Sequence, residues 1–229
     1  MKTCIVIPVY NSPYICEVVE DLLKYDEYQI IVVDDGSDIR VEINHPDVKV
    51  ETHPVNMGKG EAILTGAKRA KALGYKSFVT IDADKQHLSS EISKLIDAYT
   101  EESIVIGNRN FEHSNVPISS KFGRIFSNFW VTLETFQKLG DTQSGFRVYP
   151  ISILNLDVKN RRFDFEIEVL VLHAYKKRKL IDVKVECYYP PYAERISHFD
   201  QVKDNIRLSL LHTKLIIQRF ILLRGFLWC

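Results

Sequence analysis

Two carboxylates one residue apart follow an apolar segment at residues 78–81. These carboxylates are Asp82 and Asp84. A short apolar run rich in β-branched residues is typical of a buried strand. Open α/β sheets bind ligands at the carboxyl ends of their strands, and paired carboxylates suit Mg²⁺ or Mn²⁺ completed by water and phosphate oxygens. The spacing therefore predicts a metal site, with simple capping of the next helix as the alternative.

Two earlier apolar segments also end in polar residues. The first ends at Tyr10 and Asn11, and the second ends at Asp34 and Asp35. A helical pattern over residues 13–25 lies between them, and a strand-helix-strand order predicts a parallel unit with a right-handed crossover. The polar residues that follow these strands are therefore expected to meet Asp82 and Asp84 at one edge of the sheet.

Hydrophobic periodicity predicts strands and helices in alternation along most of the chain. The predicted strands are 4–10, 29–34, 48–52, 78–81, 103–109, a short one after 146 and 180–188, and the predicted helices are 13–25, 59–73, 88–100, 110–140, 163–175 and one from about 200. This order is typical of an α/β fold with a mostly parallel central sheet flanked by helices.

A glycine-rich turn at residues 56–60 precedes one of the predicted helices, with Gly58, Lys59 and Gly60 at its end. Free N–H groups at a helix N-terminus can bind an anion, so this turn is a candidate phosphate site. The alternative is that the glycines only permit a tight turn. The Walker A spacing is absent, and no Gly-x-Gly-x-x-Gly follows the first strand, so the sequence argues against P-loop NTPases and Rossmann dehydrogenases.

Composition narrows the class of protein. The 229 residues fit one domain, and 30 Lys and Arg balance 30 Asp and Glu, so no overall field favours nucleic acid. The four cysteines lack a Cys-x-x-Cys spacing, which argues against zinc and favours inert thiols in a reducing cytoplasm. We expect neither a signal peptide nor a membrane-spanning segment, since no apolar stretch reaches about 18 residues.

The end of the chain is basic and apolar. From residue 201 onward five Lys and Arg oppose Asp204 alone, a net charge of +5 − 1 = +4, so the first 200 residues carry −4. Apolar residues recur among these cations from Lys203 to Trp228. The pattern predicts an amphipathic basic helix over 201–229 that lies on an anionic membrane surface, and a core-packing or dimer helix is the alternative.

Seven motifs occur in an order that resembles the family 2 glycosyltransferases with the GT-A fold. They are Ile7-Pro8-Val9-Tyr10-Asn11, Val32-Val33-Asp34-Asp35-Gly36-Ser37, Asn56-x-Gly58-Lys59-Gly60, Asp82-Ala83-Asp84-x-Gln86-His87, Gly107-Asn108-Arg109, Ser144-Gly145-Phe146-Arg147 and Phe165-Glu166-Ile167-Glu168. The similarity points to the branch of dolichyl-phosphate mannose synthase and other polyprenyl-phosphate glycosyltransferases, and it reaches about residue 210. It implies a GT-A domain over 1–200, with a donor half to about 109 and an acceptor half over 110–200.

The resemblance also implies roles for individual residues. The family transfers a sugar from a nucleotide-sugar, here UDP- or GDP-linked, usually with inversion, and uses Mg²⁺ or Mn²⁺. Its donor pocket corresponds to Pro8, Tyr10, Asn11, Asp34, Asp35, Lys59, Asp82, Ala83 and Asp84. Its metal ligands correspond to Asp82, Asp84 and Gln86.

The acceptor decides which further residues carry the chemistry. A hydroxyl acceptor needs a general base, and Asp141 is the candidate, whereas an ionised phosphate needs cations instead. The polyprenyl-phosphate branch implies an acceptor phosphate site at Arg109, Arg124, Ser127, Asn128, Arg195 and Ser197. The predicted catalytic set is Asp84, Asp141 and Arg109. The alternative for each arginine is a solvated surface charge.

Some features depart from the family pattern. Lys85 stands where relatives often carry Gly or an aromatic residue, Asn108 replaces a frequent Ser, and no pair of transmembrane helices follows.

The sequence predicts a peripheral enzyme at the cytoplasmic face of the membrane that acts on a lipid phosphate, and a homodimer is possible. Alternatives are transfer to a glycan hydroxyl and a non-catalytic nucleotide-binding module, although the intact Asp82/Asp84 pair argues against the latter. A phosphatase or receiver-like fold with acidic strand ends is a further alternative, but the sequence lacks the phospho-acceptor Asp beside a Lys on an apolar strand that such a fold needs.

Overall fold

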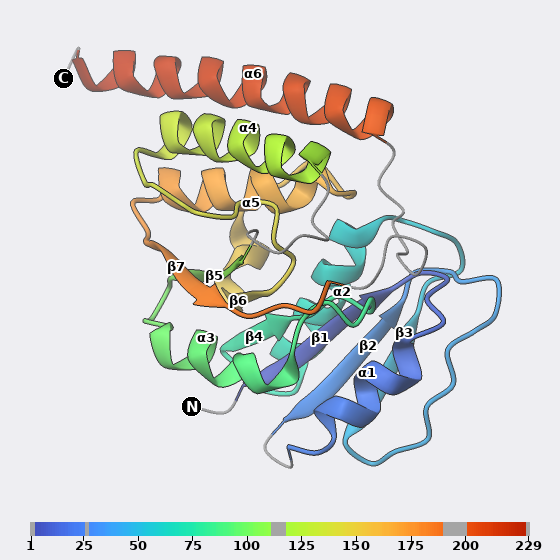
Figure 1. Ribbon diagram of the computed structural model, residues 1–229. Helices are drawn as coiled ribbons and strands as arrows, with labels where there is room; N and C mark the ends of the chain where they lie inside the picture. The colour runs from blue at the N-terminus through green and yellow to red at the C-terminus, as the bar shows by residue number, and fades with distance from the viewer. Residues whose placement is uncertain (1–2, 26–27, 111–117, 190–200, 228–229) are drawn as a thin grey trace.

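The computed structural model describes residues 3–25, 28–110, 118–189 and 201–227, with side chains left undescribed at 118–120, 201–205 and 221–227. The described chain forms one seven-stranded sheet with helices on both faces (Figure 1). The strands are β1 (Cys4–Val9), β2 (Gln29–Asp34), β3 (Val48–Thr52), β4 (Ser77–Thr80), β5 (Ile104–Arg109), β6 (Arg147–Pro150) and β7 (Leu180–Val185). The helices are α1 (Ile15–Leu22), α2 (Lys59–Ala72), α3 (Ile92–Ala98), α4 (Ile118–Thr135), α5 (Asp164–Tyr175) and α6 (Gln201–Leu227), with 3₁₀ turns at Ser89–Glu91 and Ile151–Asn155.

The strand order is β3-β2-β1-β4-β6-β5-β7. All neighbouring strands are parallel except β6, which runs antiparallel to both β4 and β5. The predicted α/β class with a mostly parallel sheet is confirmed. The insertion of β6 between β4 and β5 was not predicted, because periodicity identifies a strand without specifying its neighbours.

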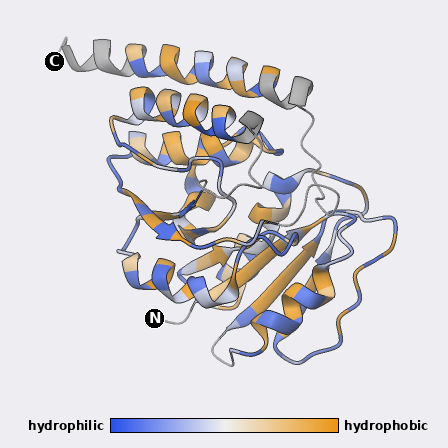
Figure 2. Cartoon of the chain, viewed as in Figure 1, coloured by the Kyte–Doolittle hydropathy of each residue, from blue (hydrophilic) through white to orange (hydrophobic). Residues whose placement is uncertain are grey.

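Each face of the sheet is covered by its own set of helices. One core contains side chains of α1 and α3, and the other contains side chains of α2, α4, α5 and α6. The central strands β1 and β2 are strongly hydrophobic in Figure 2, as expected for strands buried on both faces of a sheet, whereas the edge strands β3 and β7 are only partly buried. In Figure 1, α4, α5 and α6 form a stack of helices at one side of the molecule, and the three pack against one another.

Pro8 lies in a central strand, where a residue without an N–H is normally excluded. The ladder between β1 and β4 ends at the pairing of Val6 with Thr80. The carbonyl of Val9 accepts a hydrogen bond from the Asp35 amide, 2.8 Å away, on the other side of β1. Pro8 therefore faces the β4 side beyond the end of that ladder, and its missing donor leaves no hydrogen bond broken.

Two helices differ in detail from the predictions. The helix predicted within 110–140 ends at Thr135, because Phe136 has a positive φ of 58° and the Thr135 hydroxyl accepts the Gln137 amide at 3.1 Å. The C-terminal helix α6 is confirmed, but its amphipathic character is not: its described residues are apolar on a buried face and on an exposed one. Among the described residues no helix combines the length and the apolar character needed to cross a bilayer.

Candidate active site

Asp82 lies just past the carboxyl end of β4 and forms an ion pair with Lys59, which it shares with Glu166. Its Oδ1 is 2.7 Å from the Lys59 ammonium at the start of α2, and the same ammonium is 3.3 Å from Oε2 of Glu166 in α5. The other Glu166 carboxylate oxygen, Oε1, is buried and has no hydrogen-bond partner among the described residues. Lys59 therefore joins two acidic groups that are far apart in the sequence.

Asp82 and Asp84 have opposite electrostatic surroundings. Burial is the largest influence on the pKa of Asp82 and would raise it, but the charge and hydrogen bond of Lys59, together with His87 and Arg109, outweigh burial, so the pKa lies below its usual value. Burial raises the pKa of Asp84 to about 6, the charge of Asp82 adds to this, and Lys59 and Arg109 oppose it. Asp84 therefore lacks a sufficient positive charge nearby, which is the condition that a bound cation would relieve.

The end of β1 is tied to the loops on both sides of it. The Ser12 hydroxyl donates a hydrogen bond to the carbonyl of Ala83, between the two carboxylates. The backbone amide of Asn11 donates a hydrogen bond to the Ser37 hydroxyl at 2.9 Å. The Asn11 side chain forms two hydrogen bonds with Asp38, one as donor and one as acceptor. The expected meeting of these strand ends is thus realised by side-chain hydrogen bonds.

Asp34 and Asp35 are both buried and both hold loops. Asp34 accepts the Ser37 amide at 3.0 Å and the Val41 amide at 3.1 Å. Asp35 accepts the amides of Met57 and Gly58 at 2.9 and 2.8 Å, and its Oδ1 is also 2.7 Å from Nδ1 of His53. These contacts fix the loops after β2 and before α2. A contact between either carboxylate and a ligand stays a prediction.

Four backbone amides in and beside the glycine-rich turn before α2 are already hydrogen-bonded within the protein, contrary to the expectation from its sequence. Asp35 receives the amides of Met57 and Gly58, and the carbonyl of Arg161 receives those of Gly60 and Glu61 at 2.8 and 3.2 Å. A Cβ on Gly58 would lie 2.4 Å from that carbonyl oxygen. The glycines therefore permit close packing of the turn against the loop before α5, which was the alternative interpretation.

Arg109 and Asp141 form a two-pronged ion pair. Arg109 Nε is 2.6 Å from Oδ2 of Asp141 and Nη2 is 3.2 Å from Oδ1, while Asp141 is 0% exposed and the Arg109 side chain is 16% exposed. Arg124 from α4 donates to the backbone carbonyl of Arg109 at 2.9 Å. Arg109 also lowers the pKa of Asp82 and of Asp84, so both Lys59 and Arg109 act on the carboxylate pair.

Ser127 and Asn128 attach α4 to the turn that carries Asp141. Ser127 shares a 2.8 Å hydrogen bond with the Thr142 hydroxyl, and Asn128 bonds the Gly140 carbonyl and the Thr142 amide at 2.7 and 2.9 Å. These contacts position Asp141, and the predicted phosphate contacts of Ser127 and Asn128 stay untested. Arg195 and Ser197, the other members of the predicted acceptor site, lie outside the described residues.

Three buried residues support the site and were not assigned a role from the sequence. Arg147 is fully buried and donates to the carbonyls of Thr142, Ser144 and Glu166 at 2.8, 2.6 and 2.8 Å. Burial lowers the pKa of His87 to about 4, and its ring stacks on a neighbouring phenylalanine. Glu166, Arg147 and His87 all belong to motifs that the sequence analysis identified, and this was the signal that could have assigned them to the site. Their contacts could not be predicted, because their partners come from distant segments.

The carboxylate pair fits a divalent cation only in part. Asp82 and Asp84 supply hard oxygen ligands, and the pKa of Asp84 is raised first by burial and then by the neighbouring charge of Asp82. Among the described residues no group of three or more His, Cys, Asp or Glu side chains could hold a metal ion. An ion here would thus need oxygen ligands from a substrate or water, as Mg²⁺ commonly does. The predicted contribution of Gln86 stays untested.

Gly145 offers a test of this site. A Cβ there would lie 2.4 Å from Oδ2 of Asp82 and 2.7 Å from Lys59 Nζ. We expect Gly145→Ala to displace Asp82 and to weaken Mn²⁺ binding by at least about tenfold, measured by calorimetric titration. Gly123→Ala in α4 is the matched control, since the nearest atom to its Cβ is 3.6 Å away. Equal Mn²⁺ affinity in both variants would show that Asp82 is not a ligand.

Comparison with known proteins gives a consistent picture. Residues 4–157 match the family model described as Glycosyl transferase family 2. The chain is 30% identical over 217 residues to the Methanococcus voltae UDP-N-acetylglucosamine–dolichyl-phosphate N-acetylglucosaminyltransferase, covering 82% of this chain and 86% of that protein. It is 24% identical over 204 residues to the Micrococcus luteus undecaprenyl-phosphate mannosyltransferase, covering 81% and 83%.

A solved structure supports the fold. Glucosyl-3-phosphoglycerate synthase from Mycobacterium tuberculosis, crystallised with Mn²⁺, UDP-glucose and phosphoglyceric acid, superposes with a TM-score of 0.63 at 17% identity. The match covers 95% of this chain and 79% of that one. The predicted GT-A fold is thereby confirmed.

Proposed function

The chain belongs to glycosyl transferase family 2, and on that basis we propose that it transfers a sugar from a UDP- or GDP-sugar to a polyprenyl phosphate with inversion. The observation that carries the choice of acceptor is the ion pair of Arg109 with the buried Asp141. A carboxylate engaged by a guanidinium through both oxygens is poorly placed to remove a proton from a hydroxyl. A phosphate monoester is already ionised at neutral pH and needs cations instead of a base.

The site residues divide the work of this reaction. Arg109 and Arg124 bind the acceptor phosphate and orient one of its oxygens towards the anomeric carbon of the sugar. That oxygen forms a bond to the anomeric carbon as the bond from this carbon to the nucleoside diphosphate breaks. Asp82 and Asp84 would hold a divalent cation, which would supply charge neutralisation for the leaving diphosphate. Asp141 orients Arg109, and Ser127 and Asn128 hold the turn that carries Asp141. No proton transfer is required.

The donor side of the proposal uses the ends of β1, β2 and β4. Pro8, Tyr10 and Asn11 line the pocket for base and ribose, and Asp34 and Asp35 remain the candidates for contact with the base. Support comes from the hydrogen bonds that join these strand ends. We further propose the division into a donor half over 1–109 and an acceptor half over 110–200, and a place of action at the cytoplasmic face of the membrane.

A transfer assay with paired acceptors tests the proposal. Purified protein, with Mn²⁺ or Mg²⁺, is incubated with UDP- and GDP-sugars and either a short polyprenyl phosphate or the matching polyprenol. We expect nucleoside diphosphate release that rises only with the phosphate, and a glycosyl polyprenyl phosphate detected by mass spectrometry. Transfer to a glycan hydroxyl, with none to the phosphate, would replace the proposal by the hydroxyl-acceptor alternative.

A further inference from the structure

Lys59 is a largely buried cation that two carboxylates share. Its ammonium lies 2.7 Å from Oδ1 of Asp82 and 3.3 Å from Oε2 of Glu166, and the three side chains are 16%, 24% and 6% exposed. The shorter distance shows that Lys59 is bound mainly to Asp82 and only loosely to Glu166. Asp82 is also one of the two carboxylates that would hold a divalent cation. The position beside its Oδ1 is therefore already occupied by a positive charge.

Glu166 can accept a closer contact from Lys59. Its second carboxylate oxygen, Oε1, is buried and accepts no hydrogen bond among the described residues. A buried acceptor without a donor is destabilising, and a lysine ammonium carries three donors on a flexible stem. The backbone of Glu166 is held in place, because its carbonyl accepts a hydrogen bond from the fully buried Arg147 at 2.8 Å. A closer contact would therefore come from a movement of the Lys59 side chain.

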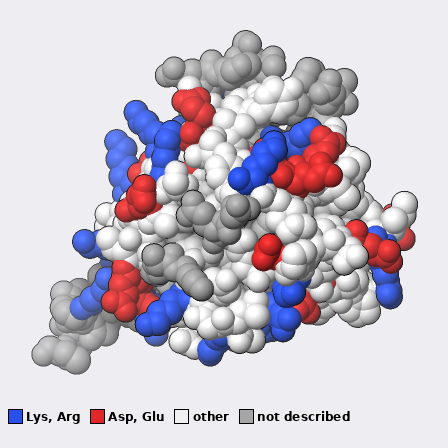
Figure 3. All heavy atoms as spheres, turned by 90° about the horizontal axis from the view of Figure 1, so that it is seen from below, with Lys and Arg blue, Asp and Glu red and all other residues white. Residues whose placement is uncertain are grey.

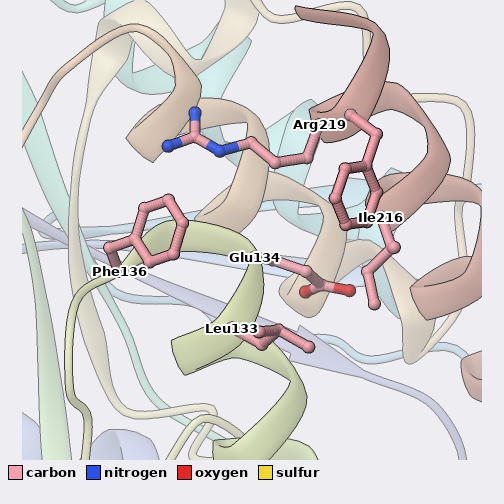
Figure 4. Close-up of a pocket in the computed structure, with 6 residues that line it drawn as sticks. Leu133, Glu134, Phe136, Ile216 and Arg219 are labelled. Carbon is pink, nitrogen blue, oxygen red and sulfur yellow. The ribbon is translucent and has the colours of Figure 1, made fainter. Parts of the chain in front are cut away.

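In the described part of the chain, Glu134 is the other buried carboxylate with an unpartnered oxygen. It lies between α4 and α6, where its Oε1 is 2.9 Å from Nδ1 of His212, and it lines a small pocket together with Arg219 and apolar side chains (Figure 4). Its ion-pair partner is thus His212 and not Lys59. Glu134 therefore provides a comparison for Glu166, with the same chemistry in a different pair.

The charges at the surface of the protein differ from Lys59 in their exposure to water. The surface seen from below in Figure 3 carries acidic and basic side chains next to one another. Exposed ion pairs of this kind are screened by water and salt, so the loss of one charge has little effect. The ion pairs of Lys59 are largely shielded from water, and a second cation placed on Asp82 would repel the ammonium strongly. Lys59 and a divalent cation therefore compete for Asp82.

We propose that Lys59 occupies Asp82 as an internal cation in the metal-free protein and moves onto Glu166 when a divalent cation binds Asp82. The Glu166 carboxylate then receives the ammonium through both oxygens, and its unpartnered Oε1 gains a donor. Before this exchange Lys59 offsets the negative charge of Asp82, and after it the divalent cation does so. Glu166 is thus a positioning residue that acts through Lys59.

The exchange has a consequence for the order of binding, which rests on the proposed function. A divalent cation must displace Lys59 from Asp82, so the free protein binds the cation more weakly than it would without Lys59. The diphosphate of a nucleotide-sugar supplies further oxygen ligands to the cation and so favours the displacement. The cation and the sugar donor are therefore expected to enter the site together.

Titration of the full chain with Mn²⁺, followed by electron paramagnetic resonance, tests the exchange without a sugar donor. We expect Lys59→Met to strengthen Mn²⁺ binding by about tenfold, because the competing charge is gone, and Glu166→Gln to weaken it by about tenfold. In the Lys59→Met background, Glu166→Gln should change the affinity by less than about twofold, because no lysine remains to be received. The matched controls are Glu134→Gln and Lys68→Met, since Lys68 is a 63% exposed lysine of the same helix α2.

A measurement on the wild-type protein accompanies the variants, because Lys59→Met leaves two carboxylates without their cation. A crystal structure with bound Mn²⁺ should place Lys59 Nζ within about 3.2 Å of both carboxylate oxygens of Glu166 and more than about 4 Å from Oδ1 of Asp82. This result does not depend on the folding of any variant.

Several results would overturn the proposal. The first is a Lys59 ammonium that remains on Asp82 beside the bound Mn²⁺. The second is an equal loss of Mn²⁺ affinity from Glu166→Gln with and without Lys59, which would show that Glu166 acts only through its charge. The third is the absence of Mn²⁺ binding by both the wild type and Lys59→Met. Failure of the proposed function looks different: the exchange is observed, but no sugar reaches any polyprenyl phosphate.

Discussion

Asp84→Asn should reduce sugar transfer by about 10³-fold and leave the protein at least as stable as the wild type. A divalent cation contributes several kcal/mol to stabilising a leaving diphosphate, and about 1.4 kcal/mol corresponds to a factor of ten in rate. The asparagine keeps the oxygen that accepts the Gln86 amide at 3.0 Å, so the turn is preserved. It also removes a charge whose burial raises the pKa of Asp84 to about 6.

The pH dependence separates this explanation from simple misfolding. The pKa of Asp84 in the folded protein lies above the value of 3.8 for a free side chain. The ionised carboxylate therefore lowers the stability of the metal-free fold above about pH 6, and this loss of stability disappears as the pH falls towards 3.8. The variant should therefore unfold at a higher temperature than the wild type at pH 8, and the difference should shrink at pH 5. Differential scanning calorimetry of the metal-free proteins measures both values.

Metal binding supplies the second readout of the same substitution. Because a proton competes with the cation for Asp84, the Mn²⁺ affinity of the wild type should fall by about tenfold per pH unit below about 6, and that slope should be lost in Asp84→Asn. Asp97→Asn, at an exposed position near the end of α3, serves as the control. A sugar-transfer rate of Asp84→Asn equal to that of the wild type would show that Asp84 is not a catalytic residue.

The second large effect is expected at the Arg109–Asp141 pair. Arg109→Gln should destabilise the fold by about 3–5 kcal/mol, because it leaves the buried Asp141 carboxylate without its counter-charge. It should also lower kcat/KM for the polyprenyl phosphate by about 10²-fold, mainly through KM, because a charge-assisted contact to the acceptor is lost. Chemical denaturation and steady-state kinetics measure the two effects separately.

The double variant Arg109→Gln with Asp141→Asn separates folding from function. It removes both charges at once, so we expect much of the lost stability to return while transfer remains impaired. Asp141→Asn alone distinguishes the two acceptor chemistries. A positioning role predicts a raised KM for the phosphate with an unchanged pH profile, whereas a general base predicts a collapse of kcat and loss of the acidic limb of that profile. The latter result would favour a hydroxyl acceptor.

Local sequence was enough to identify the fold class and the centre of the site. The apolar runs that end in Tyr10-Asn11 and Asp34-Asp35, and the strand before Asp82, predicted parallel strands whose polar ends converge, because strand periodicity and chain order are local properties. Motif order was sufficient for the family. The carboxylate pair could be proposed as a metal site from its spacing alone, since that argument needs only residue type and the end of one strand.

The tertiary structure decided which residues surround that pair. The antiparallel β6 inserts between β4 and β5 and pairs Arg147 with both Thr80 and Ile106, which brings Gly145 against Asp82. Lys59 receives Glu166 as a second partner from across the chain. These contacts depend on strand order and register, which residue spacing does not encode.

Three interpretations of single segments changed for the same reason. Four amides of the glycine-rich turn bind Asp35 and Arg161, Asp141 forms an ion pair with Arg109, and α4 exposes an aromatic row. The sequence presents a donor, an acceptor or an apolar side chain without its partner. Which of them is satisfied within the fold, and which is left for a ligand or a membrane, is set by packing between segments that are distant along the chain.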